Sequence, residues 1–379
     1  MVGDILLKII FVVNSLEFFI SHRLPIAITA RDCGYTVHIA SMGSVEVEKI
    51  KNYGFVHHRV PFTRRGQNPF VEFRAFIYLY RLFKDVQPDL VHLITIKPVL
   101  YGGIAARMAR IKSVVVAITG LGTVFIAQTK MAIIRRRLIS LMYNLAIGET
   151  ATVIFQNLDD RNILLKFCRL KLKQVRIIKG SGVDLDSYRL SPQHQGVPVV
   201  VMAARLLRDK GVFEFIEAAR ILRLRSVPLK MRLIGEIDQG NPTSVSESEM
   251  ELWRKEGVVE LIDYSKNIPH QYAAANIVCL PSYREGLPKG LVEAAACGRA
   301  VITTDVPGCC DAIVPGVTGI LVPVRNATAL ADAIQDLIER PLKRKKMGEA
   351  GRKLAEQEFG IKKIVEQHMN IYKELLTDA

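Results

Sequence analysis

Short apolar runs that alternate with helical segments are the feature that most constrains the fold of this chain. Runs such as Leu90–Ile94 and Ser113–Ile118 are largely apolar throughout, which is typical of strands buried on both faces of a parallel sheet. Each run is followed by a helical segment, and this alternation predicts an α/β fold with doubly wound parallel sheets. We therefore expect ligand sites in the loops beyond the carboxyl ends of the strands.

The alternation passes through two halves joined by a polar stretch, Leu190–Gly196, which is interpreted as a linker. The prediction is one domain over residues 1–190, a second over 191–360 and a final helix over 361–379. With 379 residues, 49% of them apolar, the chain can form two substantial cores. The predicted strands are Lys8–Val13, Thr36–Ala40, His57–Val60, Leu90–Ile94, Ser113–Ile118, Thr152–Gln156, Val175–Lys179, Pro198–Ala203, Lys230–Ile234, Val259–Ile262, Asn276–Leu280 and Ala300–Thr304.

Positive charge is concentrated in the first half. Residues 1–190 hold 27 Lys and Arg against 13 Asp and Glu, whereas the rest holds 25 against 24. This asymmetry indicates an anionic partner for the first domain, either nucleic acid or a membrane surface. No run reaches the roughly eighteen apolar residues of a spanning helix, and the six cysteines lack disulfide or C-x-x-C spacing. The expectation is a soluble or peripheral protein in a reducing cytoplasm.

The stretch Pro281–Gly298 combines a strand end, a loop and a helix start. Glu285 falls in the loop and Glu293 inside the following helix, so both carboxylates could face a ligand over the helix N-terminus. The amides of the first turn, about Leu287 to Leu291, would favour a diphosphate there. This order of groups suits a sugar nucleotide; the alternative is a surface loop followed by an amphipathic helix with an exposed Glu.

Two cations follow the first strand of the second half. Arg205 at the strand end can hold a phosphate in a fork, and Lys210 at the next helix start adds a point charge. The alternative for these groups is a surface ion pair with Asp209. The loop that begins at Gly235 follows another strand and is expected to form a wall of the same site.

Loops of the first half supply further candidates. His22 and Arg23 are placed at the start of a helix predicted over Arg23–Cys33, where His22 either caps the helix or contacts a ligand. Gly120 and Gly122 offer backbone amides or form a plain tight turn. A helix over 128–146 sets Arg135, Arg136 and Arg137 among apolar residues, so it either lies on an anionic membrane or packs on the core.

These motifs together resemble the retaining glycosyltransferases of family 4. Glu285 and Glu293 match the family's E-x7-E signature, Arg205 to Gly211 its R-x4-K-G element, and Gly182-Val-Asp184 its G-V-D turn. His92, Thr95 and Lys97 match its V-H-x-H-x-x-K region, but Ile94 replaces the second His. The resemblance implies the GT-B fold, two Rossmann-like domains facing across a cleft, with a UDP-sugar donor and no metal or other cofactor.

The resemblance also assigns the site residues. Glu285, Arg205 and Lys210 would act in catalysis, and Glu293, Leu287, Lys289, Gly290, Leu291, Gly235, Asn267 and Ile268 would bind the donor. The acceptor side would comprise His22, Arg23, His92, Lys97, Gly120 and Gly122.

Two segments narrow the resemblance. F-x-x-S-H-R-x-P-I at residues 18–26 and G-L-G-T-x-F at 120–125 are similar to bacterial enzymes that extend saccharides on undecaprenyl diphosphate, especially those that add N-acetylgalactosamine. The implied partners are a UDP-sugar, a polyprenyl-diphosphate-linked glycan and the anionic inner face of the cytoplasmic membrane, with no nucleic acid. A nucleotide-sugar epimerase of similar fold and a basic nucleic-acid-binding protein are the alternatives, although no nucleic-acid-reading module is recognised.

Overall fold

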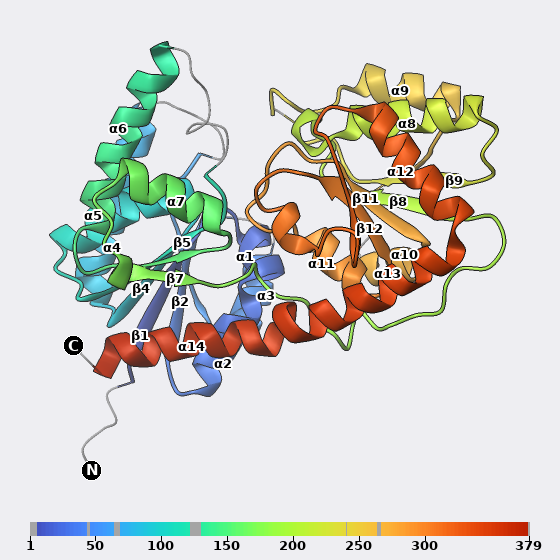
Figure 1. Cartoon of the computed structure of the whole chain (residues 1–379). Coiled ribbons are helices and arrows are strands. Elements are labelled where there is room, and N and C mark those ends of the chain that lie inside the picture. The colour runs from blue at the N-terminus through green and yellow to red at the C-terminus, as the bar shows by residue number, and fades with distance from the viewer. Residues whose placement is uncertain are drawn as a thin grey trace. The chain divides into compact units, whose positions relative to one another are not determined.

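The computed structural model describes residues 6–43, 46–63, 69–121, 130–239, 241–263 and 267–377. Its contacts divide the chain into two compact units, which are considered separately below (Figure 1). The first unit comprises Met1–Ser181 with Lys362–Ala379, and the second comprises Gly182–Ile361. The linker predicted from the sequence, Leu190–Gly196, belongs to the second unit.

A seven-stranded sheet of order β3-β2-β1-β4-β5-β6-β7 forms the centre of the first unit. Every pairing is parallel, as the continuous apolar runs predicted. The register places Ile10 of the central strand between His38 and Val91. The strands are β1 (Lys8–Val12), β2 (Thr36–Ser41), β3 (Val56–Arg59), β4 (Leu90–Ile94), β5 (Ser113–Ile118), β6 (Thr152–Phe155) and β7 (Val175–Ile177).

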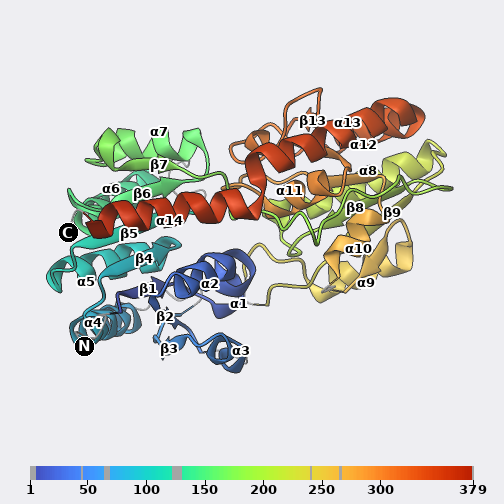
Figure 2. The same ribbon diagram turned by 90° about the horizontal axis from the view of Figure 1, so that it is seen from below.

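Helices cover both faces of this sheet. One face, which carries Ile10, Val91 and Val114, packs against α4 to α6; the other lies under α1, α2 and the C-terminal helix α14 (Figure 2). The helices are α1 (Leu16–His22), α2 (Leu24–Asp32), α3 (Val47–Asn52), α4 (Pro69–Val86), α5 (Gly103–Met108), α6 (Lys130–Ile147), α7 (Leu158–Phe167) and α14 (Ile361–Thr377), with a π turn at Pro98–Gly102 and a 3-10 turn at Leu172–Gln174.

The helix predicted over Arg23–Cys33 is confirmed as α2, one residue shorter at each end. A separate helix, α1, precedes it, and the Ser15 Oγ caps α1 by accepting from the Phe18 amide at 3.2 Å. The sequence analysis placed this segment among the loops of the first half. The helix there has only seven residues, Leu16–His22. The residue that caps α2 is Arg23, without a side-chain bond, so of the two alternatives for His22 the capping role is excluded.

The second unit has a six-stranded sheet of order β10-β9-β8-β11-β12-β13, again parallel throughout. The strands are β8 (Val199–Ala203), β9 (Lys230–Ile234), β10 (Glu260–Ile262), β11 (Ile277–Leu280), β12 (Ala300–Thr304) and β13 (Gly319–Val322). The sequence analysis missed β13, which is an edge strand of only four residues.

On this sheet, α8 and α12 lie side by side over one face, and α10, α11 and α13 cover the other (Figure 1). The helices of the unit are α8 (Val212–Leu224), α9 (Glu247–Glu256), α10 (Ile268–Ala273), α11 (Lys289–Ala296), α12 (Ala327–Glu339) and α13 (Pro341–Leu354), with 3-10 turns at Arg208–Lys210 and Cys310–Ala312 and a π turn at Ala355–Phe359.

Two glycines let the loops after β8, β11 and β12 approach closely. Gly211 has φ +77°, and a Cβ built on it would lie 2.1 Å from the Pro281 carbonyl oxygen. Gly308 has φ +83°, and its Cβ would lie 2.4 Å from the Glu285 carbonyl oxygen. Any larger residue would push these backbones apart, so both glycines fix the position of the loop that carries Glu285.

Candidate active site

Lys210 and Glu285 meet at the carboxyl end of the second sheet. Lys210 ends the 3-10 turn before α8, and Glu285 lies in the loop between β11 and α11. The Lys210 Nζ contacts Glu285 Oε1, and the Ser282 Oγ donates to the same oxygen at 2.7 Å. Both charged side chains are largely buried, at 21% and 13% exposure. The pair is therefore held in one orientation rather than solvated as an ordinary surface ion pair.

Arg205 lies near this pair in sequence but has a different partner. Its Nη1 donates to Asp238 Oδ2 at 3.1 Å, and Asp238 is buried whereas the Arg205 side chain is 57% exposed. The alternative of an ion pair with Asp209 is thus not what the structure shows. One edge of the guanidinium is anchored, and the exposed remainder can bind an anion with oriented N–H donors.

Glu293 lies inside α11 and is only 7% exposed, so the alternative of an exposed Glu on an amphipathic helix was wrong. Its Oε1 lies 3.3 Å from the Lys289 Nζ, and the Tyr188 phenol lies near its carboxylate. Burial raises the pKa of Glu293, while Lys289 and Tyr188 act in the opposite direction. The structure thus keeps a carboxylate beneath the start of a helix, where hydroxyl groups of a ligand can be recognised.

The start of α11 lies beside these carboxylates. Pro288 is the N-cap, and the Leu291 amide donates to the Pro288 carbonyl at 3.1 Å. A Cβ on Gly290 would lie 2.9 Å from the Tyr272 hydroxyl oxygen, so a larger residue would displace that hydroxyl. Leu287 packs partly buried against the core. The N-terminal end of the helix, with its partial positive charge, is suited to phosphate.

The remaining predicted donor residues come from neighbouring strand ends. A Cβ on Gly235 would lie 2.0 Å from the Ala204 carbonyl oxygen, so the loop after β9 lies directly against the loop after β8. Asn267 caps α10, where its Oδ1 accepts from the His270 amide at 3.3 Å. Ile268 begins that helix and packs against the core. Residues 264–266, which precede them in this loop, lie outside the described residues.

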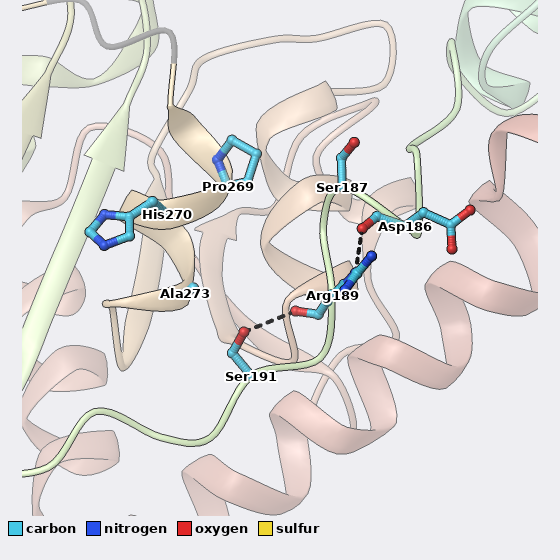
Figure 3. A pocket seen from close by; sticks show the side chains of 7 residues that line it. All are labelled: Asp186, Ser187, Arg189, Ser191, Pro269, His270 and Ala273. Atoms are coloured by element: carbon cyan, nitrogen blue, oxygen red, sulfur yellow. Dashed lines mark hydrogen bonds between the residues drawn. The ribbon is translucent and has the colours of Figure 1, made fainter.

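A shallow groove on the second unit lies beside α10 rather than at these residues (Figure 3). It is lined by Asp186, Ser187, Arg189, Ser191, Pro269, His270 and Ala273. Within it the Arg189 Nε donates to the Asp186 carbonyl at 2.8 Å, and the Ser191 Oγ donates to the Arg189 carbonyl at 3.1 Å. The groove contains no predicted site residue.

In the first unit, Arg23 and His92 lie inside the protein. His92 is fully buried, and its Nδ1 lies 2.6 Å from the Tyr372 hydroxyl of α14, with the His368 ring 5.7 Å away. Arg23 is 2% exposed, and its Nη1 donates to the His22 carbonyl. Burial lowers the pKa of His92 well below its usual value and lowers that of Arg23 to about 10. His92 is therefore a neutral core histidine in this structure, and Ile94 beside it is equally buried.

The other acceptor candidates are nearer the surface. His22 is half-buried at the end of α1, where it stacks on Phe18 with ring centroids 4.2 Å apart and its Nδ1 lies 2.6 Å from the Ser21 Oγ. Lys97 is paired with Glu72 at 2.5 Å and donates to the Thr63 carbonyl at 2.8 Å. Gly120 is exposed with φ +131°. Gly122 lies outside the described residues.

Helix α6 exposes an apolar stripe, which comprises Met131, Ile134, Leu138, Leu141 and Leu145. These residues recur every three or four positions, so they share one helical face, and each is 48–75% exposed. Arg135 and Arg137 are exposed on the same helix, while the Arg136 guanidinium lies 4.6 Å from the centre of the Phe167 ring. The helix also packs on the core through Tyr143 and Ile147, as the core-packed alternative expected, so the exposed stripe is a feature in addition to that packing. Across the described residues, no helix is long and apolar enough to cross a membrane.

Sequence reasoning missed several partners in these clusters: Asp238, Ser282, Tyr188 and Tyr372. Asp238 and Ser282 lie in the strand-end loops, where the fold class alone gave reason to examine every polar side chain. Tyr188 lies near Glu293, 105 positions away in sequence, and Tyr372 contacts His92, 280 positions away. No local pattern could have revealed these pairs.

Comparison with known families and structures agrees with these features. Residues 189–354 match the family "Glycosyl transferases group 1", and residues 8–157 match "Glycosyl transferase 4-like". A Campylobacter jejuni N,N'-diacetylbacillosaminyl-diphospho-undecaprenol alpha-1,3-N-acetylgalactosaminyltransferase is 28% identical over 84% of this chain and 85% of its own length. The Staphylococcus aureus capsular polysaccharide glycosyltransferase CapM is 26% identical over 90% and 91%.

Solved structures resemble the fold over nearly its full length. A glycosyltransferase from Rickettsia africae has a TM-score of 0.79 at 20% identity and covers 99% of this chain and 100% of its own. Anabaena Alr3699/HepE, solved with UDP and glucose, has a TM-score of 0.78 at 19% identity and covers 97% and 99%. The GT-B fold expected from the sequence is confirmed.

Proposed function

We propose that this chain, which belongs to the glycosyltransferases, moves a hexose or N-acetylhexosamine from a UDP-sugar to a saccharide carried on polyprenyl diphosphate. The observation that carries the donor half of the proposal is the cluster at the carboxyl end of the second sheet. There Lys210 pairs with Glu285, Arg205 exposes its guanidinium, and the buried Glu293 lies in the helix that starts beside them.

Each group has a distinct role in this proposal. Glu293 accepts hydrogen bonds from the ribose hydroxyls, and Glu285 accepts them from the sugar. Arg205, Lys210 and the first amides of α11 hold the diphosphate as negative charge develops on it during departure. Because the chain itself supplies these positive groups, the proposal needs no metal or other cofactor.

The reaction retains the anomeric configuration in this proposal. An inverting enzyme needs a base to take the acceptor proton on the face opposite the leaving group. Ile94 stands where the family's second His is expected, and His92 is buried and bonded to Tyr372. In a same-face reaction the departing diphosphate can take the proton itself. An α-linked donor then gives an α-linked product.

The acceptor assignment rests on the first unit and on the relatives. The Campylobacter jejuni relative is named as a transferase that acts on an undecaprenol-diphosphate-linked sugar. The apolar stripe of α6, flanked by Arg135 and Arg137, is suited to the interface of an anionic bilayer, with each Arg contributing about 1 kcal/mol. We place the enzyme on the cytoplasmic face of the inner membrane, where such an acceptor would be presented.

The test is product analysis with the full chain and a panel of UDP-hexoses and UDP-N-acetylhexosamines, with and without a polyprenyl-diphosphate saccharide. We expect UDP release that depends on the lipid-linked acceptor and a new α-linkage by proton NMR. Interconversion of UDP-sugars without acceptor would instead identify an epimerase. A β-anomeric coupling would contradict the same-face reaction.

A further inference from the structure

The loop that follows β9 is hydrogen-bonded to the segment that carries Arg205. The residue after it, Leu206, is 1% exposed, and its amide donates to the Glu236 carbonyl at 3.1 Å. Its carbonyl in turn accepts from the Val245 amide at 2.9 Å. Both ends of the loop are therefore bonded to the residue beside Arg205, so the loop and the backbone of Arg205 keep a fixed position relative to each other.

Asp238 lies in this loop, and contacts within the loop fix its position. Its amide donates to the Ser244 Oγ at 3.0 Å, and its carbonyl accepts from the Asn241 amide at 2.9 Å. The Asn241 Nδ2 also donates to Asp238 Oδ2 at 3.1 Å. The carboxylate is thus held in place by groups other than Arg205.

The contact between Asp238 and Arg205 joins a buried group to an exposed one. The Asp238 side chain is only 5% exposed, whereas that of Arg205 is 57% exposed. The Arg205 Nη1 donates to Asp238 Oδ2 at 3.1 Å. One of the five guanidinium N–H groups is used there, and because the guanidinium is planar, this bond restricts the directions in which the others point. An exposed arginine without such a contact would have to lose side-chain entropy whenever it bound a ligand.

Asp238 also offsets the positive charge of Arg205. A carboxylate beside the guanidinium weakens the attraction of Arg205 for any anion, including free UDP. What the contact supplies is orientation, and donors that already point at the site of developing charge need no reorganisation during the reaction. Interactions that are stronger in the transition state raise kcat, whereas those that are equal in both states raise only affinity. The contact should therefore favour turnover over nucleotide affinity.

We propose that Asp238 is a positioning residue that directs the Arg205 guanidinium toward the departing diphosphate and lowers its attraction for the free nucleotide. This inference rests on the proposed function, in which Arg205 stabilises the diphosphate. It adds a residue outside the predicted site, and it explains why a carboxylate is buried beside a cation that is needed for binding an anion.

The test compares the full-length wild type with Asp238→Asn, which keeps the side-chain shape and removes the charge. With the UDP-sugar and lipid-linked acceptor that support transfer, we expect the single-turnover rate to fall about 10- to 100-fold, as for a lost hydrogen bond between charged groups. UDP affinity by calorimetry should equal that of the wild type or be tighter, because a negative charge near the diphosphate is removed. Asp336→Asn is the matched control: Asp336 pairs with Arg340 at 2.7 Å in the same unit, and its replacement should change neither quantity.

A double-mutant cycle separates positioning from loop stability. In the Arg205→Ala background, Asp238→Asn should lower the rate no further, because no guanidinium remains to be oriented. Fluorescence of Trp253, which is buried in the same unit, should match the wild type in both single variants. Loss of UDP affinity together with rate in Asp238→Asn, or a further loss in the double variant, would overturn the proposal and assign Asp238 to loop stability.

Two further outcomes separate this inference from the proposed function. A wild-type rate in Asp238→Asn, beside a slow Arg205→Ala variant, would overturn the role of Asp238 alone. A wild-type rate in Arg205→Ala would overturn the diphosphate contact of Arg205, and with it the part of the proposed function on which the role of Asp238 depends.

Discussion

The two units share one architecture, but their candidate site residues have different polar neighbours. The first unit encloses basic side chains, Arg23 among them, beneath α14 together with His92 and His368. The second unit keeps carboxylates, Glu285 and Glu293, in contact with lysines at the end of its sheet. A parallel α/β framework therefore does not dictate the chemistry of its strand ends, which depends on the side chains placed there.

The difference is visible in proton affinity. In the first unit, burial lowers the pKa of His38 to about 4 and of His368 to about 3, and it lowers those of His57, His58 and His92 as well. In the second unit, burial raises the pKa of Glu293. The first unit thus holds neutral groups that resist gaining protons, whereas the second holds a carboxylate that gains one more easily.

The largest expected effect concerns the cations of the second unit. Arg205→Ala and Lys210→Ala should each lower kcat/KM, with a loss of transition-state stabilisation of about 2–4 kcal/mol. This loss is comparable to that of one donor at a developing oxyanion. Steady-state kinetics with a UDP-sugar and lipid acceptor measure this loss. Arg208→Ala is the matched control because Arg208 lies in the same turn but pairs with Glu249 and stacks on Phe213. Near-normal turnover in both variants would contradict the proposed role of Arg205 and Lys210 at the diphosphate.

A second effect tests the first unit. Arg135→Glu with Arg137→Glu should weaken binding to anionic vesicles by about 2–3 kcal/mol, since each basic residue near the surface contributes about 1 kcal/mol. UDP affinity should not change. Vesicle co-sedimentation measures the loss, with Lys345→Glu and Lys346→Glu in the second unit as a charge-matched control. Equal loss in the control pair would assign membrane binding to net charge rather than to α6.

The two acids of the second unit should behave differently. Glu293→Gln should weaken UDP itself by about 2 kcal/mol because bonds from ribose to a charged acceptor are replaced by weaker ones. Glu285→Gln should leave UDP affinity near wild type and lower turnover of the UDP-sugar. Calorimetry with UDP alone and kinetics with the sugar nucleotide distinguish these outcomes. If Glu285→Gln weakens UDP as strongly as Glu293→Gln, the division between sugar and ribose is wrong.

The expected effect that is smallest for each residue is on stability against pH. Histidines with lowered folded pKa bind protons more tightly when unfolded, so their contribution is present above about pH 6.5 and is lost as the pH falls. Glu293 has a raised pKa in the folded chain, so it binds its proton more tightly when folded, and its contribution to stability increases as the pH falls. Acidification from pH 7.5 to 5.5 should therefore destabilise the first unit more, on the order of 1 kcal/mol for each buried histidine.

Urea unfolding can resolve this difference because the only tryptophan, Trp253, is buried in the second unit. The urea midpoint followed by Trp253 fluorescence should change less with pH than the midpoint followed by the circular dichroism of the whole chain. His368→Leu should reduce the shift seen by circular dichroism. A larger shift of the Trp253 transition would contradict the comparison.

The sequence predicted much of the fold, and it predicted that Lys210, Glu285 and Glu293 follow strand ends of the second sheet, because those signals are local. Continuous apolar runs identified twelve of the strands, and the E-x7-E spacing brought Glu285 and Glu293 to one helix start. Contacts set by distant segments were not predictable in this way. His92 is buried by Tyr372 of the last helix, and Arg205 is anchored by Asp238 from the next strand-end loop. A local pattern shows which residue occurs, but not what covers it.

The measurement that tests the division between the two units most directly is hydrogen–deuterium exchange of the full chain with and without UDP. The account predicts that UDP slows exchange at residues 205–211 and 285–293 in the second unit. It predicts no change at residues 90–97 of the first. Protection of residues 90–97 without protection of 285–293 would contradict the assignment of the nucleotide to the second unit.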